Sequence, residues 1–193
     1  MGHDVGMAPF HAIVLAGGRA SRLGGIDKVL IRHEGRELLS RAVDAAAGAE
    51  RVAIVGPHRD VPFARAALWV REDPPFSGPA HAVAAGLSAL GPGDDDRVLV
   101  LAADLIRPEL VVRDLLAGPG NRVAVDPTGR RQWACSLVRA GDLAAAIARM
   151  DTAGAPLKAL IGGLDPADVP VSAEAGADLD TPDDLKEYAD DER

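Results

Sequence analysis

The chain contains 193 residues, of which 48% are hydrophobic and 26% charged, a balance that is typical of one globular domain and excludes disordered, fibrous and membrane-spanning chains. Its formal charge is −8 and its aromatic content 3%. These values exclude a basic face for duplex nucleic acid and a stacking platform for single strands. Because the chain has a single cysteine, Cys135, and shows no signal-like or membrane-length apolar run, it is predicted to be cytoplasmic.

Short β-branched runs alternate with Ala- and Leu-rich stretches of helical length along the whole chain. Strands are predicted at 11–16, 51–56, 67–70, 97–103, 122–126 and 132–138, and helices at 37–47, 79–90, 108–116, 141–150 and 181–189. The runs around Ile13 and Val98 are almost continuously apolar, as in parallel strands that are covered on both faces. The pattern predicts an α/β fold with a mostly parallel sheet.

The domain boundaries follow from composition. One domain is expected over residues 10–189, preceded by a flexible extension at 1–9 and followed by a short acidic tail at 190–193. Between the predicted elements no segment has the length or composition of a linker.

The segment IVLAGGRASRLGGIDK, residues 13–28, joins an apolar strand to a loop that carries Gly17, Gly18, Arg22 and Lys28. Glycines let backbone N–H groups approach an anion closely, and nearby cations offset phosphate charge. The loop follows the carboxyl end of a strand, where open α/β sheets bind ligands. Its spacing fits neither GxxxxGK[ST] nor GxGxxG. The residues alone therefore indicate either a phosphate-binding loop or an ordinary Gly-rich turn with solvated arginines.

The run LAGGRASRLGGIDK resembles the LAGGxSxRMGxDK signature of the MobA-like nucleotidyltransferase family, the relatives of molybdenum cofactor guanylyltransferase. Three further segments resemble that family in the same order: SGPAHAVAAGLSAL from Ser77, LVLAADL from Leu99 and ADLDTPDDL from Ala177. Together the four segments span nearly the whole chain. The resemblance implies a three-layer α/β/α Rossmann-like nucleotidyltransferase domain.

The same resemblance implies a reaction and its participants. GMP would pass from GTP to molybdopterin with release of pyrophosphate, in the presence of Mg²⁺. GTP and molybdopterin would be the small-molecule substrates, with no nucleic acid or membrane involved. A molybdenum enzyme or another protein of cofactor biosynthesis is a candidate partner.

The resemblance also implies roles for individual residues. Arg22, Lys28 and Asp104 would be catalytic: Arg22 would hold the leaving pyrophosphate, Lys28 the α-phosphate, and Asp104 the Mg²⁺ ion. Asp180, or in its place Asp178, would be the second metal ligand. The nucleotide would be bound by Leu15, Ala16, Gly17, Gly18, Arg22, Lys28, Asp73, Gly78 and Pro79.

Structural interpretations of the same residues stay open. Asp104 is also a residue type that caps helices, and Asp178 and Asp180 also suit the start of a helix at 181–189. His81 is expected to lie on the surface or in a loop. The remaining side chains of note are expected to serve packing: Trp69, Trp133 and Cys135.

The chain departs from the family pattern at several places. Ala20 replaces a serine, Gly25-Ile26 lengthens the first loop, and Ala82 replaces a glycine. The segment after Asp104 is shorter than the family's DxPFLxPE. Two alternatives therefore remain: a transferase of the same family that uses CTP or another phosphorylated acceptor, and a non-catalytic homologue that binds nucleotide without turnover.

Overall fold

The computed structural model describes residues 9–17 and 27–177. Its principal strands are β1 (Phe10–Leu15), β4 (Val52–Val55), β5 (Leu68–Val70), β6 (Arg97–Ala102), β7 (Arg122–Val125), β8 (Arg131–Arg139) and β9 (Ala167–Pro170). A hairpin is formed by β2 (Arg32–His33) and β3 (Arg36–Glu37). The helices are the 3₁₀ turn η1 (Lys28–Leu30), α1 (Leu38–Ala45), α2 (Pro79–Leu90), α3 (Pro108–Leu116), α4 (Ala140–Ala148) and α5 (Leu157–Gly162).

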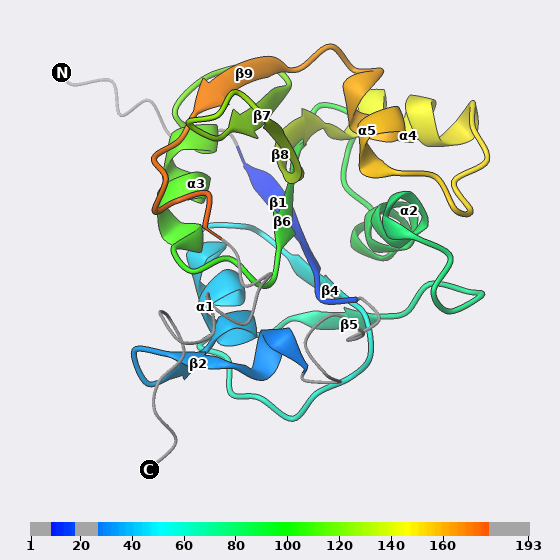
Figure 1. The fold of residues 1–193 in the computed structure, drawn as a ribbon. Coiled ribbons are helices and arrows are strands. Elements are labelled where there is room, and N and C mark those ends of the chain that lie inside the picture. The colour runs from blue at the N-terminus through cyan, green and yellow to red at the C-terminus, as the bar shows by residue number, and fades with distance from the viewer. Residues whose placement is uncertain (1–8, 18–26, 178–193) are drawn as a thin grey trace, which may run out of the picture.

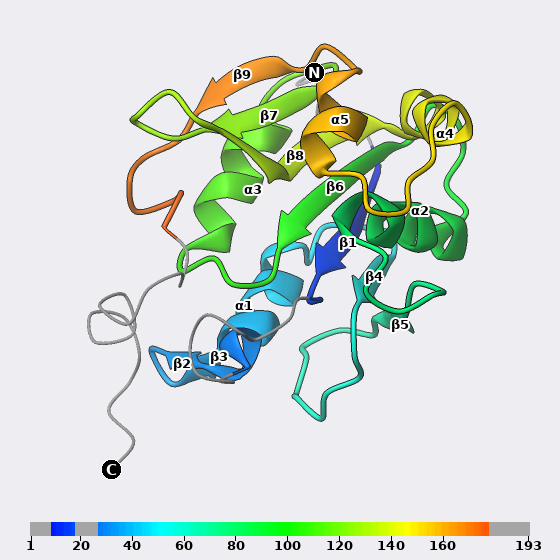
Figure 2. The same ribbon diagram turned by 45° about the vertical axis from the view of Figure 1, so that its right-hand side comes forward.

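Within the described residues, seven strands form one sheet in the order β5-β4-β1-β6-β8-β7-β9. The strands β5, β4, β1 and β6 are parallel to one another, and β7 is parallel to β9. Strand β8 runs antiparallel to both of its neighbours. Figure 1 shows this sheet between the helices, and Figure 2 shows β1, β4 and β6 ending on the same side. The predicted α/β fold with a mostly parallel sheet is confirmed.

Helices cover both faces of the sheet. Alternate residues of the central strand point to opposite faces, so they belong to different cores. Ala12 and Val14 of β1 belong to a core that also contains α1 and α3, whereas Ile13 belongs to a second core with α2, α4 and α5. Helix α2 lies very close to β1: a Cβ atom at Gly86 would be 2.8 Å from Ile13 Cγ2. The predicted three layers are therefore present, with β1 buried between two cores.

The predicted strands and helices within the described residues are confirmed, with small shifts at their ends. Helices α2 and α3 occupy the predicted residues, and each begins with a proline, whose missing N–H group has no partner to lose in the first turn. Helix α1 begins after Glu37, because Glu37 pairs with Arg32 in the hairpin, and it ends at Ala45, before the predicted end at residue 47. The helix predicted at 181–189 lies outside the described residues.

Five short elements were not predicted: η1, β2, β3, α5 and β9. Two-residue strands carry no periodicity, and the hairpin depends on positive φ angles at Glu34 and Gly35. Strand β9 buries only Val169 among its four residues, so it shows no apolar run. Its position in the sheet comes from pairing with β7, which is a tertiary effect.

None of the helices within the described residues has both the length and the apolar character that a membrane crossing requires. The predicted domain boundaries at residues 9 and 189 border segments that the structure does not describe, so they stay predictions.

Candidate functional site

A cavity of about 230 Å³ opens at the carboxyl ends of β1 and β4, beside the start of α2. We call it the edge cavity. It is lined by Leu15, Gly17, Val55, Glu72, Phe76, Gly78, Pro79 and Ala82. Four of these residues, Leu15, Gly17, Gly78 and Pro79, were predicted to contact nucleotide. The structure thus brings together two sequence segments that are far apart in the chain.

The backbone at the exit of β1 is fixed by its neighbour β4. Ala16 donates its N–H to the carbonyl of Val55, 2.9 Å away, and its carbonyl accepts a hydrogen bond from Arg59 at 2.9 Å. A Cβ atom at Gly56, where φ is +151°, would lie only 2.7 Å from the Ala16 carbonyl group. Glycine at position 56 therefore permits this close approach. The N–H and the carbonyl of Ala16 are thus both hydrogen-bonded within the protein. The next residue, Gly17, lines the edge cavity.

The opposite wall of the edge cavity is a turn held in place by hydrogen bonds. The carboxylate of Glu72, 9% exposed, accepts the backbone N–H of Phe76 at 3.1 Å. Gly78 adopts a φ of +97° and packs its backbone against Gly154, whose N–H donates to the carbonyl of Ser77 at 2.7 Å. The wall is thereby joined to the loop that precedes α5.

His81, which was predicted to lie on the surface or in a loop, is partly exposed and helps to hold this wall. It lies in the first turn of α2, with one ring nitrogen 2.8 Å from the hydroxyl of Thr152 and the other 3.0 Å from the carbonyl of Asp73. Asp73 was predicted to contact nucleotide, but it does not line the edge cavity, whereas its neighbour Glu72 does. Sequence reasoning placed an acidic residue here and missed which of the two faces the cavity.

Asp104 lies at the same edge of the sheet. It follows β6 by two residues, and the N–H of the intervening Ala103 donates to the carbonyl of Leu15 at 3.2 Å. The Asp104 side chain is half-buried. Because Leu15 also lines the edge cavity, the predicted metal ligand stands beside the predicted nucleotide site.

The C-terminal part of the described chain runs directly past this position. The N–H of Ile106 donates to the carbonyl of Ala177 at 3.1 Å, and both side chains pack together with Leu38. Ala177 immediately precedes Asp178 in the sequence. Asp178 and Asp180 themselves lie outside the described residues, as do Gly18 and Arg22.

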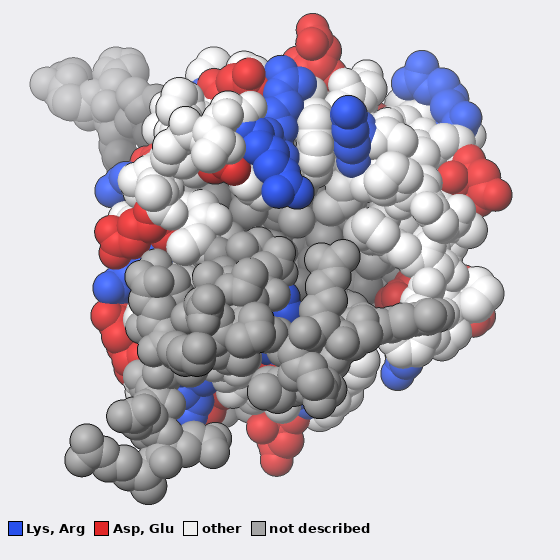
Figure 3. All heavy atoms as spheres, viewed as in Figure 1, with Lys and Arg blue, Asp and Glu red and all other residues white. Residues whose placement is uncertain are grey.

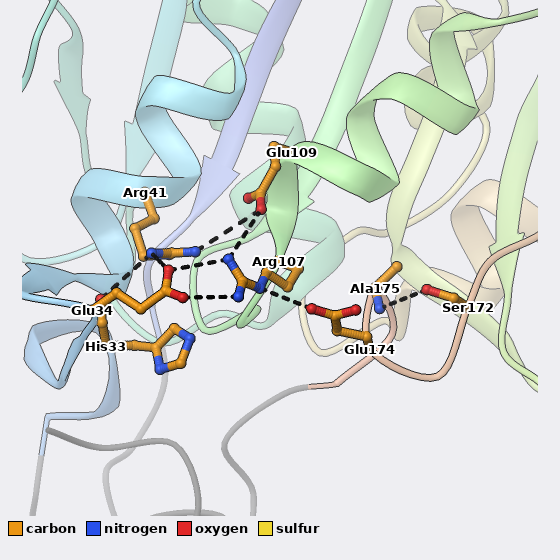
Figure 4. Close-up of polar contacts among 8 residues, drawn as sticks. All are labelled: His33, Glu34, Arg41, Arg107, Glu109, Ser172, Glu174 and Ala175. Carbon is orange, nitrogen blue, oxygen red and sulfur yellow. Dashed lines mark hydrogen bonds and ion pairs between the residues drawn. The ribbon is translucent and has the colours of Figure 1, made fainter.

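Four segments meet in an ion-pair network around Arg107 (Figure 4). Arg107 donates to both carboxylate oxygens of Glu34, at 3.0 and 2.8 Å, and to Glu174 at 3.0 Å. Arg41 of α1 donates to Glu34 as well, at 3.0 Å. Sequence reasoning missed this network because its members come from distant parts of the chain. It ties the shortened segment after Asp104 to the β2–β3 turn and to residues 172–177.

The network affects the titration of Glu34. Hydrogen bonds from Arg41, and then from Arg107, hold the pKa of Glu34 below its ordinary value of 4.5. A carboxylate with a lowered pKa stabilises the folded state above its ordinary pKa, and this stability is lost as the pH falls through the folded pKa. We therefore expect Glu34→Gln to lower the melting temperature at about pH 7, and this effect to shrink as the pH falls below 4.5 through the lowered pKa of Glu34.

Thermal unfolding of both proteins across this pH range measures the effect. The control is Asp95→Asn, because Asp95 is a highly exposed carboxylate whose ion pair among the described residues is with Arg139. A melting difference for Glu34→Gln that stays constant with pH would contradict the assignment.

A second hollow, of about 640 Å³, is lined by Arg130, Arg131, Gln132, Trp133 and Lys158. We call it the basic hollow; Figure 3 shows Lys and Arg side chains gathered over the β7–β8 hairpin and α5. Because β8 is antiparallel to β6 and Cys135 pairs with Leu101, the first residues of β8 extend past the carboxyl end of β6. The basic hollow therefore opens at the same edge as Asp104, on the far side of β6 from the edge cavity.

The hairpin that carries the basic hollow is well ordered by one carboxylate. Asp126 accepts hydrogen bonds from the hydroxyl and N–H of Thr128, the N–H of Arg130 and the side chain of Gln132. These bonds, the Thr128 hydroxyl first, hold the pKa of Asp126 below its ordinary value. These bonds fix the backbone of the turn at Arg130 and the side chain of Gln132.

The charges in the basic hollow are only partly balanced. Arg131 donates to Asp168 at 2.6 Å and lies over the ring of Trp133, 5.5 Å from its centroid. Among the described residues, the side chains of Arg130 and Lys158 form no ion pair. Trp133 packs on the core as predicted, but one side of it also lines the hollow. Trp69 and the buried Cys135 are packing residues, as predicted.

Lys28 is the first residue of η1, directly after the Gly-rich loop. The next residue, Val29, is buried in the core with α1, so the position of this short helix is anchored. Lys28 itself is half-buried.

A mostly parallel sheet that is covered on both faces, with a cavity and a carboxylate at the carboxyl ends of its central strands, is the arrangement of α/β proteins that bind nucleotides and other small ligands. Comparison with known families then identifies the chain more closely. Residues 12–167 match the model of the MobA-like NTP transferase domain family. The chain belongs to this family of nucleotidyltransferases.

Individual relatives agree with this membership. The chain is 40% identical over 168 residues to the bifunctional protein GlmU of Xanthobacter autotrophicus, covering 77% of this chain and 36% of that protein. It is 32% identical over 142 residues to the molybdenum cofactor guanylyltransferase of Cereibacter sphaeroides, covering 70% of this chain and 74% of the relative. This chain thus spans little more than a third of GlmU.

Among solved structures, the inositol-1-phosphate CTP transferase of T. maritima superimposes with a TM-score of 0.67 at 15% identity, covering 92% of each chain. At this identity the likeness concerns the fold.

Proposed function

We propose that this protein transfers GMP from GTP to molybdopterin and releases pyrophosphate. The observation that carries the proposal is the edge cavity, because residues of the Gly-rich signature and of the Gly78-Pro79 segment line it together beside Asp104. Membership in the MobA-like family and the guanylyltransferase relative support the same reaction.

The size of the edge cavity suits one part of the nucleotide. Its volume of about 230 Å³ is below the range of about 300–1,000 Å³ that is usual for whole drug-sized ligands. We assign it to the base, with the phosphates extending over Gly17 toward Lys28. The apolar side chains of Leu15, Val55 and Pro79 would contact the ring.

Glu72 favours guanine among the bases. Guanine presents two adjacent N–H donors on one edge, and a carboxylate accepts both, whereas cytosine, adenine and uracil each present acceptors beside their donors. The Glu72 carboxylate lines the cavity and is almost fully buried. An acceptor facing it there would be left without a hydrogen bond, which is unfavourable in a buried site.

The transfer itself requires positioning and charge neutralisation rather than a protein nucleophile. An oxygen of the acceptor's phosphate attacks the α-phosphorus of GTP and forms a new P–O–P linkage. The bond from the α-phosphorus to the bridging oxygen breaks, and its electron pair leaves with pyrophosphate. Lys28 would face the charge that builds up on the α-phosphate, and Arg22 would hold the departing pyrophosphate.

The donor set at Asp104 fits a magnesium ion, which needs only one or two protein carboxylates alongside substrate phosphates and water. Within the described residues no group of three or more His, Cys, Asp or Glu side chains gathers around a metal position. Asp104 would be the ligand within the described residues, and Asp180 or Asp178 would supply the second. When bound, the ion neutralises phosphate charge and orients the triphosphate.

The basic hollow is the place for the rest of the acceptor. It lies across Asp104 from the edge cavity, so a molecule whose phosphate reaches the α-phosphate can extend into it. The cations suit anionic groups, and the side of Trp133 that lines the hollow offers an apolar contact. We assign it to the part of molybdopterin that does not react.

The reaction is tested by pyrophosphate release from GTP with Mg²⁺, with and without molybdopterin, with CTP and ATP in parallel. Release that requires both GTP and molybdopterin establishes the proposed function. Release with CTP or with another phosphorylated acceptor establishes the first alternative. Nucleotide binding without release in every combination points to a non-catalytic homologue.

The role of Glu72 is tested by Glu72→Gln. The amide oxygen can still accept the N–H of Phe76, so the turn is kept, but the amide NH₂ now faces a donor of guanine. Because a hydrogen bond to a charged group contributes about 1.5–3 kcal/mol, we expect KM for GTP to rise about 10- to 100-fold. The preference for GTP over CTP and ATP should shrink with it. If the selectivity is unchanged, Glu72 does not read the base.

The role of the basic hollow is tested by Arg130→Ala combined with Lys158→Ala. We expect KM for molybdopterin to rise at least about 10-fold and KM for GTP to stay within about 3-fold, since both cations are assigned to molybdopterin and neither to GTP. In a Trp69→Phe background, the fluorescence of Trp133 reports binding directly. An unchanged KM for molybdopterin together with unaltered fluorescence would remove the acceptor from this hollow.

A further inference from the structure

Arg59 joins two segments on either side of the Gly-rich loop. It follows β4, and its side chain is 10% exposed. Its Nε and Nη2 atoms donate to the two carboxylate oxygens of Asp27, at 2.6 and 3.1 Å. Its Nη1 atom donates to the carbonyls of Ala16 and Pro57, at 2.9 and 3.0 Å. One guanidinium thus connects the exit of β1 with the residue that precedes Lys28.

Asp27 is committed to this contact rather than to its own helix. It occupies the N-cap position of η1, where an aspartate commonly accepts a backbone N–H of the first turn. Its carboxylate makes no such bond here. Both oxygens are instead turned toward Arg59, so the pair serves to hold the segments together.

The contact requires an arginine. The planar fork of a guanidinium satisfies a carboxylate through two parallel bonds and still has N–H groups for carbonyls, whereas a lysine offers one ammonium on a flexible stem. Gly56 brings β4 close enough to Ala16 for the side chain to reach across. Sequence reasoning could not find Arg59, because nothing in a single arginine after a strand reveals its partners.

We propose that Arg59 is a positioning residue of the transfer reaction. By holding Asp27 at a fixed distance from the exit of β1, it sets where Lys28 lies relative to the edge cavity. It touches no substrate and acts through Asp27 and Lys28. The inference rests on the proposed function, which gives Lys28 its role at the α-phosphate.

The test is a double-mutant cycle between Arg59→Ala and Lys28→Ala. A misplacement of about 1 Å costs about 100-fold in rate, so Arg59→Ala should lower kcat by about 10- to 100-fold and change KM for GTP by less than about 3-fold. In the Lys28→Ala background it should lower kcat no further, because the group it positions is gone. Asp27→Asn should reproduce the effect, and Arg59→Lys should restore little of the activity.

Arg65→Ala is the matched control. Arg65 also donates from its guanidinium to several carbonyls, those of Ala46, Ala47, Ala49 and Glu50, but at the end of α1 and away from the site. It should lower the melting temperature and leave kcat unchanged. Equal losses of kcat for both variants, or additive effects of Arg59→Ala and Lys28→Ala, would overturn the proposal.

Amide hydrogen exchange separates this proposal from the proposed function. The N–H groups of Leu30 and Ile31 are bonded to the carbonyls of Asp27 and Lys28. Their exchange should accelerate at least about 10-fold in Arg59→Ala and not in Arg65→Ala. If the native protein releases no pyrophosphate from any substrate pair, the proposed function fails, and the exchange result alone decides whether Arg59 holds Lys28. Unchanged exchange at these amides overturns the proposal whatever the activity.

Discussion

Replacement of Lys28 by alanine is expected to reduce kcat by about 100- to 1,000-fold, the range found when one group that stabilises developing charge is removed. The ammonium follows the Gly-rich loop and would face the α-phosphate, where negative charge accumulates as the acceptor attacks. Because the benefit arises mainly in the transition state, kcat should fall far more than KM for GTP rises. Steady-state pyrophosphate release measures both constants.

The fold should tolerate this change, since Val29 and the packing of η1 on α1 anchor the segment. Arg113→Ala, which removes an exposed cation of α3 paired only to Asp114 among the described residues, controls for the loss of charge. A turnover rate that is unchanged in Lys28→Ala would remove Lys28 from the mechanism.

Replacement of Asp104 by alanine is expected to abolish turnover that depends on magnesium. Asp104 follows β6, which lies in the sheet between β1 and β8, and an ion held there would contribute several kcal/mol of charge stabilisation during the transfer. Titration with Mn²⁺, followed by electron paramagnetic resonance in the presence of GTP, reads metal binding independently of activity. We expect this binding to weaken by at least about 10-fold, because Asp104 would supply one of the two proposed protein carboxylates.

The melting temperature of Asp104→Ala should stay close to that of the native protein. Asp95→Asn is the control, because Asp95 precedes β6 and so lies at the opposite edge of the sheet. Mn²⁺ binding that is unaffected in Asp104→Ala would refute the metal assignment. If Mn²⁺ binding is lost while turnover persists, the ion is bound there but is not required.

The parts of the fold that the sequence predicts are those with a local signal. The apolar runs of β1 and β6 and the prolines that begin α2 and α3 mark these elements without reference to the rest of the chain. The hairpin of β2 and β3 and the strand β9 have no such signal, because they are formed by a tight turn or by pairing with another strand.

The same distinction applies to the candidate site. Gly17, Gly78 and Pro79 were predicted to contact nucleotide, because their motifs are local, and the structure gathers them in one cavity. The choice between Glu72 and Asp73 depends on which way a turn faces, which the sequence does not reveal. Arg59 and Arg107 act through partners that lie far from them in the sequence, so only the folded structure shows their contacts.

The pairing of β1 has a consequence for how the protein acquires its binding ability. Ala12 pairs with Val52 on one side and with Leu99 on the other, so the central strand has no local partner. Folds dominated by such distant pairings form more slowly than those built from local contacts. During synthesis, both edges of β1 can be covered only once residues 97–102 have left the ribosome. The proposed nucleotide binding at the end of β1 would therefore require β1 to be held between β4 and β6, and it would report that the centre of the sheet has formed.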